Sequence, residues 1–285
     1  MKTKVFLMIM ALAIFSFTSC NKLRNPIETR SAELVDDDAV TEVALDDVFN
    51  TVDNATIILE NQLGGTKGVL TSDLVLADSC PTITISSGAF PKTITINYGT
   101  GCTGLNGSTR SGKIIINVTD RRNVVGATRT VTFDNYFFNS IKIEGTKELK
   151  NLGPNSNQNM VISDKLIGGK LTLPAGQIIE RAFEHQREFI AGWNTKNIWD
   201  DECLITGIAT GKGINGNAYA NTILTALHWK RACEFLVSGT IKFVRTGVEP
   251  VVLDYGTGEC DAKAVLTRGD QTKEIILKHK HRLMP

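Results

Sequence analysis

The chain has 285 residues, a formal net charge of +1, 42% hydrophobic residues and 21% charged residues. This composition is typical of a globular protein with a sizeable core, and the length allows one large domain or two small ones. The near-neutral charge excludes a uniformly basic nucleic-acid binder. The absence of an apolar run of roughly 20 residues excludes a polytopic membrane protein.

Residues 1–19 have the pattern of a secretory signal peptide. Lys2 and Lys4 form a positive start, an uncharged apolar run follows, and small residues precede Cys20. Small residues directly before a cysteine resemble a bacterial lipoprotein signal, although Phe17 stands where leucine is usual. We therefore expect cleavage before Cys20, acylation of that cysteine and attachment of the exported chain to the outer membrane, on its periplasmic face or at the cell surface. The alternative is an ordinary cleaved signal with an incidental cysteine.

The next two segments differ in pattern. Residues 20–34 are polar and form the expected tether, whereas residues 35–63 form the expected helical segment. Five apolar residues recur there near the helical period: Leu45, Val48, Val52, Ala55 and Leu59. The acidic residues at 36–38 suit a helix start, whereas a calcium-binding loop would need Gly and Glu at positions where this sequence lacks them.

Residues 64–285 form the expected all-β domain. Apolar and polar residues alternate at 81–85 and 92–98, and less strictly at 113–118 and 127–133. Turn signals that contain glycine separate these short runs. The pattern predicts a mostly β fold: an antiparallel meander, either barrel-like or made of stacked sheets, preceded by one short N-terminal helix.

Two cysteine pairs stand in matching contexts, Cys80 with Cys102 and Cys233 with Cys260. Each pair flanks a strand–turn–strand pattern, and the phrase Tyr-Gly-Thr-Gly stands shortly before its second cysteine. Residues 80–118 and 233–278 thus form an internal echo.

The midpoint of each pair falls on a turn, so we expect the disulfides 80–102 and 233–260. Cys203 would then be free. Sequence alone leaves other pairings open. Each bridge should stabilise the fold by roughly 2–4 kcal/mol. We expect no metal site, because the chain has no C-x-x-C motif and His228 is the only histidine near either pair.

The same phrases carry a family resemblance. Residues 96–104, Gly107 and residues 110–115 resemble a family of uncharacterised lipoproteins from Bacteroidota. Further matching phrases stand at 133–136, 145–146, 192–193, 205–207, 238–240 and 254–256. The resemblance covers about residues 35–280 and implies no activity, cofactor or catalytic residue, because the family has no assigned function. The chain departs from the family pattern at 179–189, where Glu and Arg replace a Thr-rich stretch.

Several motifs have both a functional and a structural interpretation. Residues 211–216 fit the dinucleotide fingerprint G-x-G-x-x-G, but Asn215-Gly216 favours a hairpin turn. Arg268-Gly269-Asp270 is an RGD tripeptide that would suit host adhesion, although Gly-Asp is also a common turn pair.

Charged residues give three more candidates. Glu180, Glu184 and Glu188 share one face of a strand or helix. Strand spacing would place them roughly 13 Å apart, beyond the separation that glycoside hydrolysis uses, so a solvated face is favoured. The basic C-terminal end, with His279 and His281, is favoured over a metal site. Acidic and indole side chains that could form a glycan or cation site are Trp193, Trp199, Asp200, Asp201 and Glu202.

The sequence contains no recognisable nucleophile, zinc-protease or phosphate-loop motif. We therefore expect a non-enzymatic, lipid-anchored envelope protein that serves as a binding or structural module. We expect no cofactor and no nucleic-acid partner. Its partners would be membrane lipid through acylated Cys20 and a glycan or an envelope protein. The alternative is a glycan-binding or carbohydrate-active surface protein.

Overall fold

The computed structural model describes residues 32–65, 80–104 and 107–277, with side chains from residue 41 onward. Helix α1 spans Ala32–Gln62. The strands are β1 Thr82–Ile85, β2 Lys92–Asn97, β3 Cys102–Thr103, β4 Thr109–Val118, β5 Thr128–Phe138, β6 Ile141–Pro154, β7 Met160–Thr172, β8 Ile178–Ala191, β9 Glu202–Lys212, β10 Ala218–Lys230, β11 Ser238–Arg245, β12 Val248–Thr257, β13 Lys263–Arg268 and β14 Gln271–Ile276. No helix in these residues is long and apolar enough to cross a membrane.

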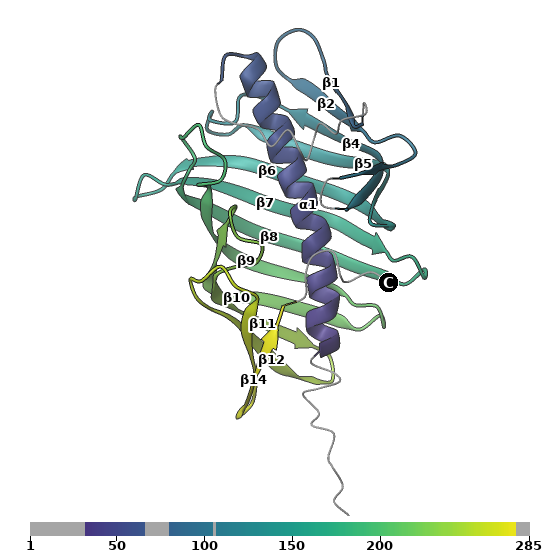
Figure 1. Cartoon of the computed structure of the whole chain (residues 1–285), viewed down its shortest axis with the longest axis vertical. Helices are drawn as coiled ribbons and strands as arrows, with labels where there is room; N and C mark the ends of the chain where they lie inside the picture. The colour runs from purple at the N-terminus through teal and green to yellow at the C-terminus, as the bar shows by residue number, and fades with distance from the viewer. Residues whose placement is uncertain (1–31, 66–79, 105–106, 278–285) are drawn as a thin grey trace, which may run out of the picture.

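All the strands belong to one antiparallel sheet in which neighbours along the chain are neighbours in space (Figure 1). The short β3 is the exception, because it pairs with β4 off the main path. The predicted mostly β meander with a preceding helix is confirmed, and it is built as one curved sheet rather than as stacked sheets. In the described part, β1 and β14 form the two edges of this sheet.

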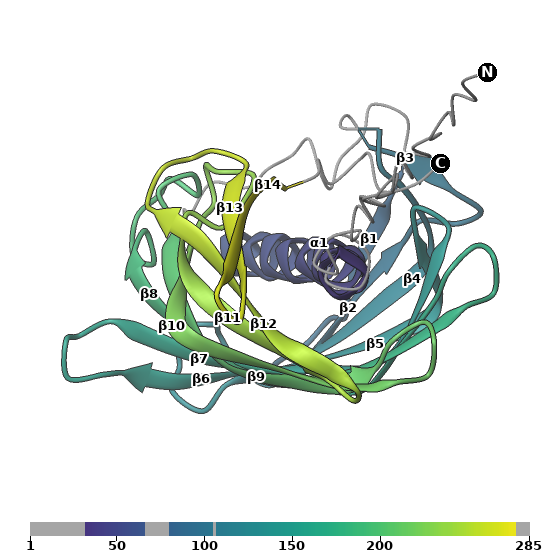
Figure 2. The same cartoon turned by 90° about the horizontal axis from the view of Figure 1, so that it is seen from below.

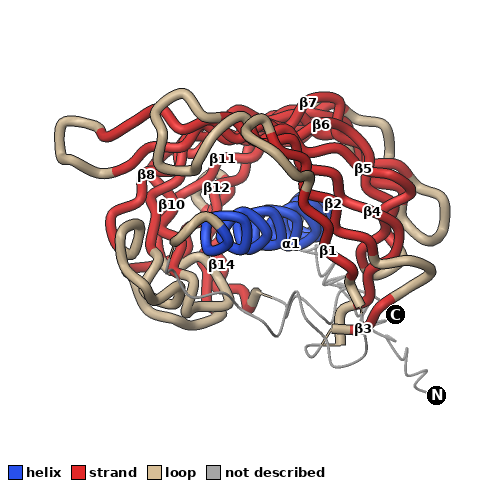
Figure 3. Tube along the Cα trace, turned by 90° about the horizontal axis from the view of Figure 1, so that it is seen from above, coloured by secondary structure: helices blue, strands red, loops and turns tan. Residues whose placement is uncertain are grey.

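The sheet curves around α1, which lies across the strands on the concave face (Figures 2 and 3). All five apolar residues predicted to face the core are buried. Burial also extends beyond one face, because residues 51–57 are buried without interruption. Such a helix must satisfy polar side chains as well as apolar ones inside the fold. It begins at Ala32, so the acidic residues at 36–38 lie within the helix rather than at its start.

Hairpin turns explain two of the motifs. The loop between β9 and β10 is closed by the Gly213 N–H donating to the Asn217 carbonyl at 3.0 Å, so the G-x-G-x-x-G stretch is a hairpin turn, as Asn215-Gly216 predicts. Gly269-Asp270 forms the tip between β13 and β14. The Arg268 side chain turns back to Glu249 of β12, with Nε 3.2 Å from Oε2.

Both predicted cysteine pairs lie at disulfide distance, with Cα–Cα separations of 6.1 Å for Cys80–Cys102 and 5.3 Å for Cys233–Cys260. Cys203 is free and buried, as expected.

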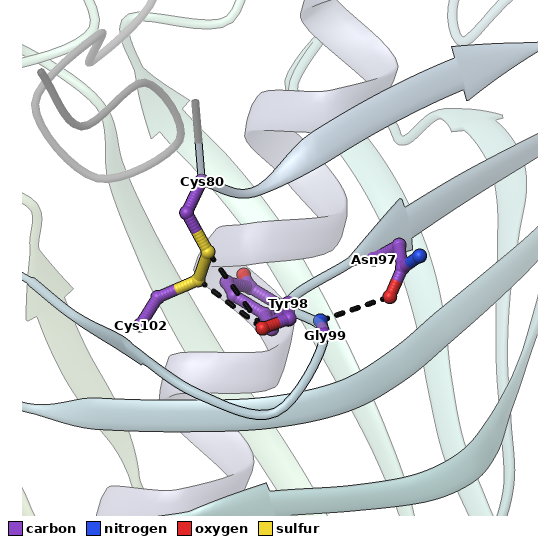
Figure 4. Close-up of a disulfide and its surroundings, with 5 residues drawn as sticks. All are labelled: Cys80, Asn97, Tyr98, Gly99 and Cys102. Atoms are coloured by element: carbon purple, nitrogen blue, oxygen red, sulfur yellow. Dashed lines mark hydrogen bonds between the residues drawn. A yellow bond between two sulfur atoms is a disulfide. The ribbon is translucent and has the colours of Figure 1, made fainter. Parts of the chain in front are cut away.

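The internal echo is also visible in local hydrogen bonds. In Figure 4, Asn97 Oδ1 accepts the N–H of Gly99 at 2.9 Å. At the second site Asp254 Oδ1 accepts the N–H of Gly256 at 2.8 Å. The same turn therefore forms at both Tyr-Gly-Thr-Gly phrases.

Candidate functional site

The concave face of the sheet is charged as well as apolar. Successive strand residues point to opposite faces, and β8 shows the result clearly. Its buried, inward-facing residues are Ile179, Arg181, Phe183, Arg187 and Phe189. Glu180 and Glu184, which alternate with them, are exposed and Glu188 is half-buried. This agrees with a solvated acidic face, and it places the arginines of the same stretch in the interior.

Helix α1 supplies carboxylates to these strand cations. Glu42 pairs with Arg181 and Asp47 with Arg110, while Asp46 Oδ1 lies 3.6 Å from Arg187 Nη2. The Tyr136 hydroxyl lies 3.4 Å from Asp47 Oδ2. The polar side of α1 is therefore held by opposite charges on β4 and β8 rather than by solvent.

A second group of charges lies entirely on the sheet. Asp164 of β7, which is fully buried, pairs with Lys147 of β6 and accepts from Arg187 Nε of β8 at 2.9 Å. Burial alone would raise the pKa of Asp164, but Lys147 and Arg187 hold that pKa below its ordinary value. The Arg187 guanidinium also lies 4.0 Å from the Phe49 ring centre, which joins this group to α1.

The third group, which we call the arginine cluster, consists of Arg122, Arg129 and Arg231 around Asp53 of α1. Asp53 lies 3.1 Å from Arg231, 3.5 Å from Arg129 and 4.0 Å from Arg122, measured between side-chain oxygen and Nη1. Arg122 comes from the β4–β5 loop, Arg129 from β5 and Arg231 from the residue after β10. Burial raises the pKa of Asp53, but the three arginines lower it more strongly, to about 2.

Neighbouring residues complete this cluster. Asn54 Oδ1 accepts from Arg231 Nη2 at 2.6 Å, and Asp201 Oδ2 lies 3.7 Å from Arg231 Nη1. The Arg122 guanidinium lies 4.1 Å from the ring centre of Trp193. Loops and strand ends from distant parts of the chain thus meet at the middle of α1.

The cluster contains more hydrogen-bond donors than its described neighbours accept. The nitrogen atoms without a hydrogen-bond partner are Arg122 Nη1 and Nη2, Arg129 Nη1 and Arg231 Nε. The side chains of these three arginines are only 9%, 8% and 4% exposed. Burial and the nearby Arg122 outweigh Asp53 and lower the pKa of Arg129. Three guanidinium groups here face two carboxylates, those of Asp53 and Asp201.

The five residues predicted for a glycan or cation site separate into two places. Trp193 and Asp201 join the arginine cluster. Trp199 is 51% exposed on a loop, where Asp200 Oδ1 accepts from the Thr195 hydroxyl at 2.8 Å. Glu202 Oε2 lies 2.8 Å from His228 Nε2. The described residues therefore do not bring all five to one groove.

Sequence reasoning missed the arginines themselves. Arg129 and Arg231 stand beside strand ends and Arg122 in a turn, where cations are usually solvated. The available signal was the pairing of these arginines with acidic residues that interrupt the apolar pattern of α1, above all Asp53.

Other reactive groups in the described part are poorly placed for catalysis. Burial raises the pKa of the Cys203 thiol to about 12 and lowers the pKa of His185, which stacks on Phe183, to about 3. Among the described residues no group of histidine, cysteine and acidic side chains is arranged to hold a metal ion. Cys20, His279 and His281 lie outside the described residues.

No family model, curated protein or solved structure matches the chain.

Proposed function

We propose that the chain is a lipid-anchored cell-envelope protein that acts as a non-enzymatic binding or structural module. The observation that carries the structural part of this proposal is the position of α1. The helix fills the concave face of the sheet, where an open sheet would otherwise offer a groove, and opposite charges hold it there. The signal pattern that ends at Cys20 supports the anchoring.

The chemistry of the described residues favours a module over an enzyme. The buried thiol of Cys203 resists ionisation because burial raises its pKa to about 12, and thiols react as thiolates. Most interior carboxylates lie beside guanidinium or ammonium groups within the fold. A general acid or base needs a titration near the working pH, and Asp53, with a pKa of about 2, lacks one.

Phase partition of the full-length chain tests the anchoring. Expressed with its signal in a Gram-negative host, the wild-type chain should enter the detergent phase of Triton X-114 and incorporate labelled palmitate. Cys20→Ser should leave the chain in the aqueous phase without label, whereas Cys203→Ser, the matched control, should behave as wild type. Equal partition of Cys20→Ser and wild type would contradict the proposal.

Membrane fractionation tests the localisation. The acylated chain should sediment with outer-membrane marker proteins in a sucrose gradient. Protease treatment of intact cells would then distinguish the cell surface from the periplasmic face. Recovery in the inner-membrane fraction would contradict the outer-membrane assignment.

A further inference from the structure

We propose that the arginine cluster binds a phosphate-type oxyanion between Arg122, Arg129 and Arg231. This inference goes beyond the envelope role and does not depend on the lipid anchor.

The first argument comes from unsatisfied donors. A buried donor without an acceptor costs free energy, and native proteins contain few of them. Here four guanidinium nitrogens from three side chains lack a hydrogen-bond partner, and all three side chains are at least nine-tenths buried. Because they gather around the single carboxylate of Asp53, one shared acceptor could serve them all.

The second argument comes from charge. Arg122, Arg129 and Arg231 carry three positive charges, whereas Asp53 and Asp201 carry two negative ones, so the cluster has an excess of one positive charge. Buried charges are normally paired. A phosphate monoanion or a phosphodiester, each with a charge near −1, would balance this excess.

The third argument comes from geometry. Guanidinium groups present N–H forks that match the oxygens of phosphate. A tetrahedral oxyanion can accept from donors that approach from different sides, as these do from the β4–β5 loop, β5 and the end of β10. The contact of Arg122 with Trp193 leaves its two Nη atoms without hydrogen-bond partners and fixes the guanidinium plane.

Thermal unfolding of the full chain in detergent tests the proposal. Inorganic phosphate and the soluble phosphodiester glycerophosphoethanolamine are compared with sodium chloride at equal ionic strength. We expect a Tm rise of about 3–6 °C at ten times Kd for at least one of the two probes. A response to phosphate alone identifies free phosphate as the ligand, whereas a response to the diester identifies a headgroup. No rise with either probe would overturn the proposal.

Two substitutions should change the response in opposite directions. Arg122→Gln removes two of the donors without partners, so the Tm response should disappear, whereas Arg121→Gln removes the same charge one position away and should retain it. Asp53→Asn removes the carboxylate that competes for the arginines, so phosphate affinity, measured by calorimetry, should rise by at least about tenfold. If Arg122→Gln fails to fold, Asp53→Asn still decides: unchanged or weaker phosphate binding would overturn the proposal.

Discussion

Replacing Asp164 by asparagine removes the only negative charge between Lys147 and Arg187 on the sheet. Asp164 is fully buried, and the side chains of Lys147 and Arg187 are 1% and 5% exposed. Removing one partner of a buried pair leaves an uncompensated charge, which costs about 3–5 kcal/mol. We expect Asp164→Asn to lower the free energy of unfolding by that amount in urea titrations followed by circular dichroism, and to lower Tm by about 6–20 °C.

Glu184→Gln is the matched control for this substitution. Glu184 lies on the neighbouring strand β8 and pairs with Lys165 at 3.3 Å, but its side chain is 70% exposed. Exposed pairs contribute about 0–1 kcal/mol, so the control should unfold almost as wild type does. Equal losses for the two variants would refute the claim that burial makes the interior charges important.

Three further predictions concern other parts of the fold. Burial lowers the pKa of His185 from 6.5 to about 3, so the unfolded chain binds more protons below pH 6.5. Stability should therefore fall by about 2 kcal/mol between pH 7 and pH 5, and His185→Gln should remove most of this slope in urea titrations at the two pH values; an unchanged slope would argue against the assignment. The Cys203 thiol should react with Ellman's reagent only after unfolding in urea; reaction in the native state would contradict its burial. A Cβ at Gly112, where φ is +77°, would lie 1.9 Å from the Asn135 carbonyl oxygen. Gly112→Ala should therefore cost at least about 3 kcal/mol. Gly126→Ala, which has a similar φ but open space around it, should cost about 1 kcal/mol, and similar losses would contradict the close approach.

The sequence contained enough information for the meander, the buried face of α1 and the two disulfides. Each of these depends on a local pattern: period-two alternation, period-3.6 spacing or repeated turn phrases around cysteines. The hairpin interpretation of residues 211–216 succeeded for the same reason, because Asn-Gly favours a two-residue turn whatever surrounds it.

The charged interior could not be predicted from such patterns. Arg181 and Arg187 alternate with glutamates on β8, and strand periodicity alone does not tell which of two charged faces points inward. The decision depends on the partners that α1 and β7 bring, such as Asp46 and Asp164, which are far away in the sequence. Asp201 was selected for its charge and position, but its buried contact with Arg231 required the three-dimensional fold.

Native-state hydrogen exchange of α1 tests most directly the claim that the helix is an integral, charge-held part of the interior. Residues 51–57 are buried without interruption, and Asp53 and Asn54 bind Arg231 from the sheet. The amides of these residues should exchange only through global unfolding, with the same free energy as the central strands β6, β7 and β8. Exchange of the helix at a much lower free energy than these strands would contradict the account.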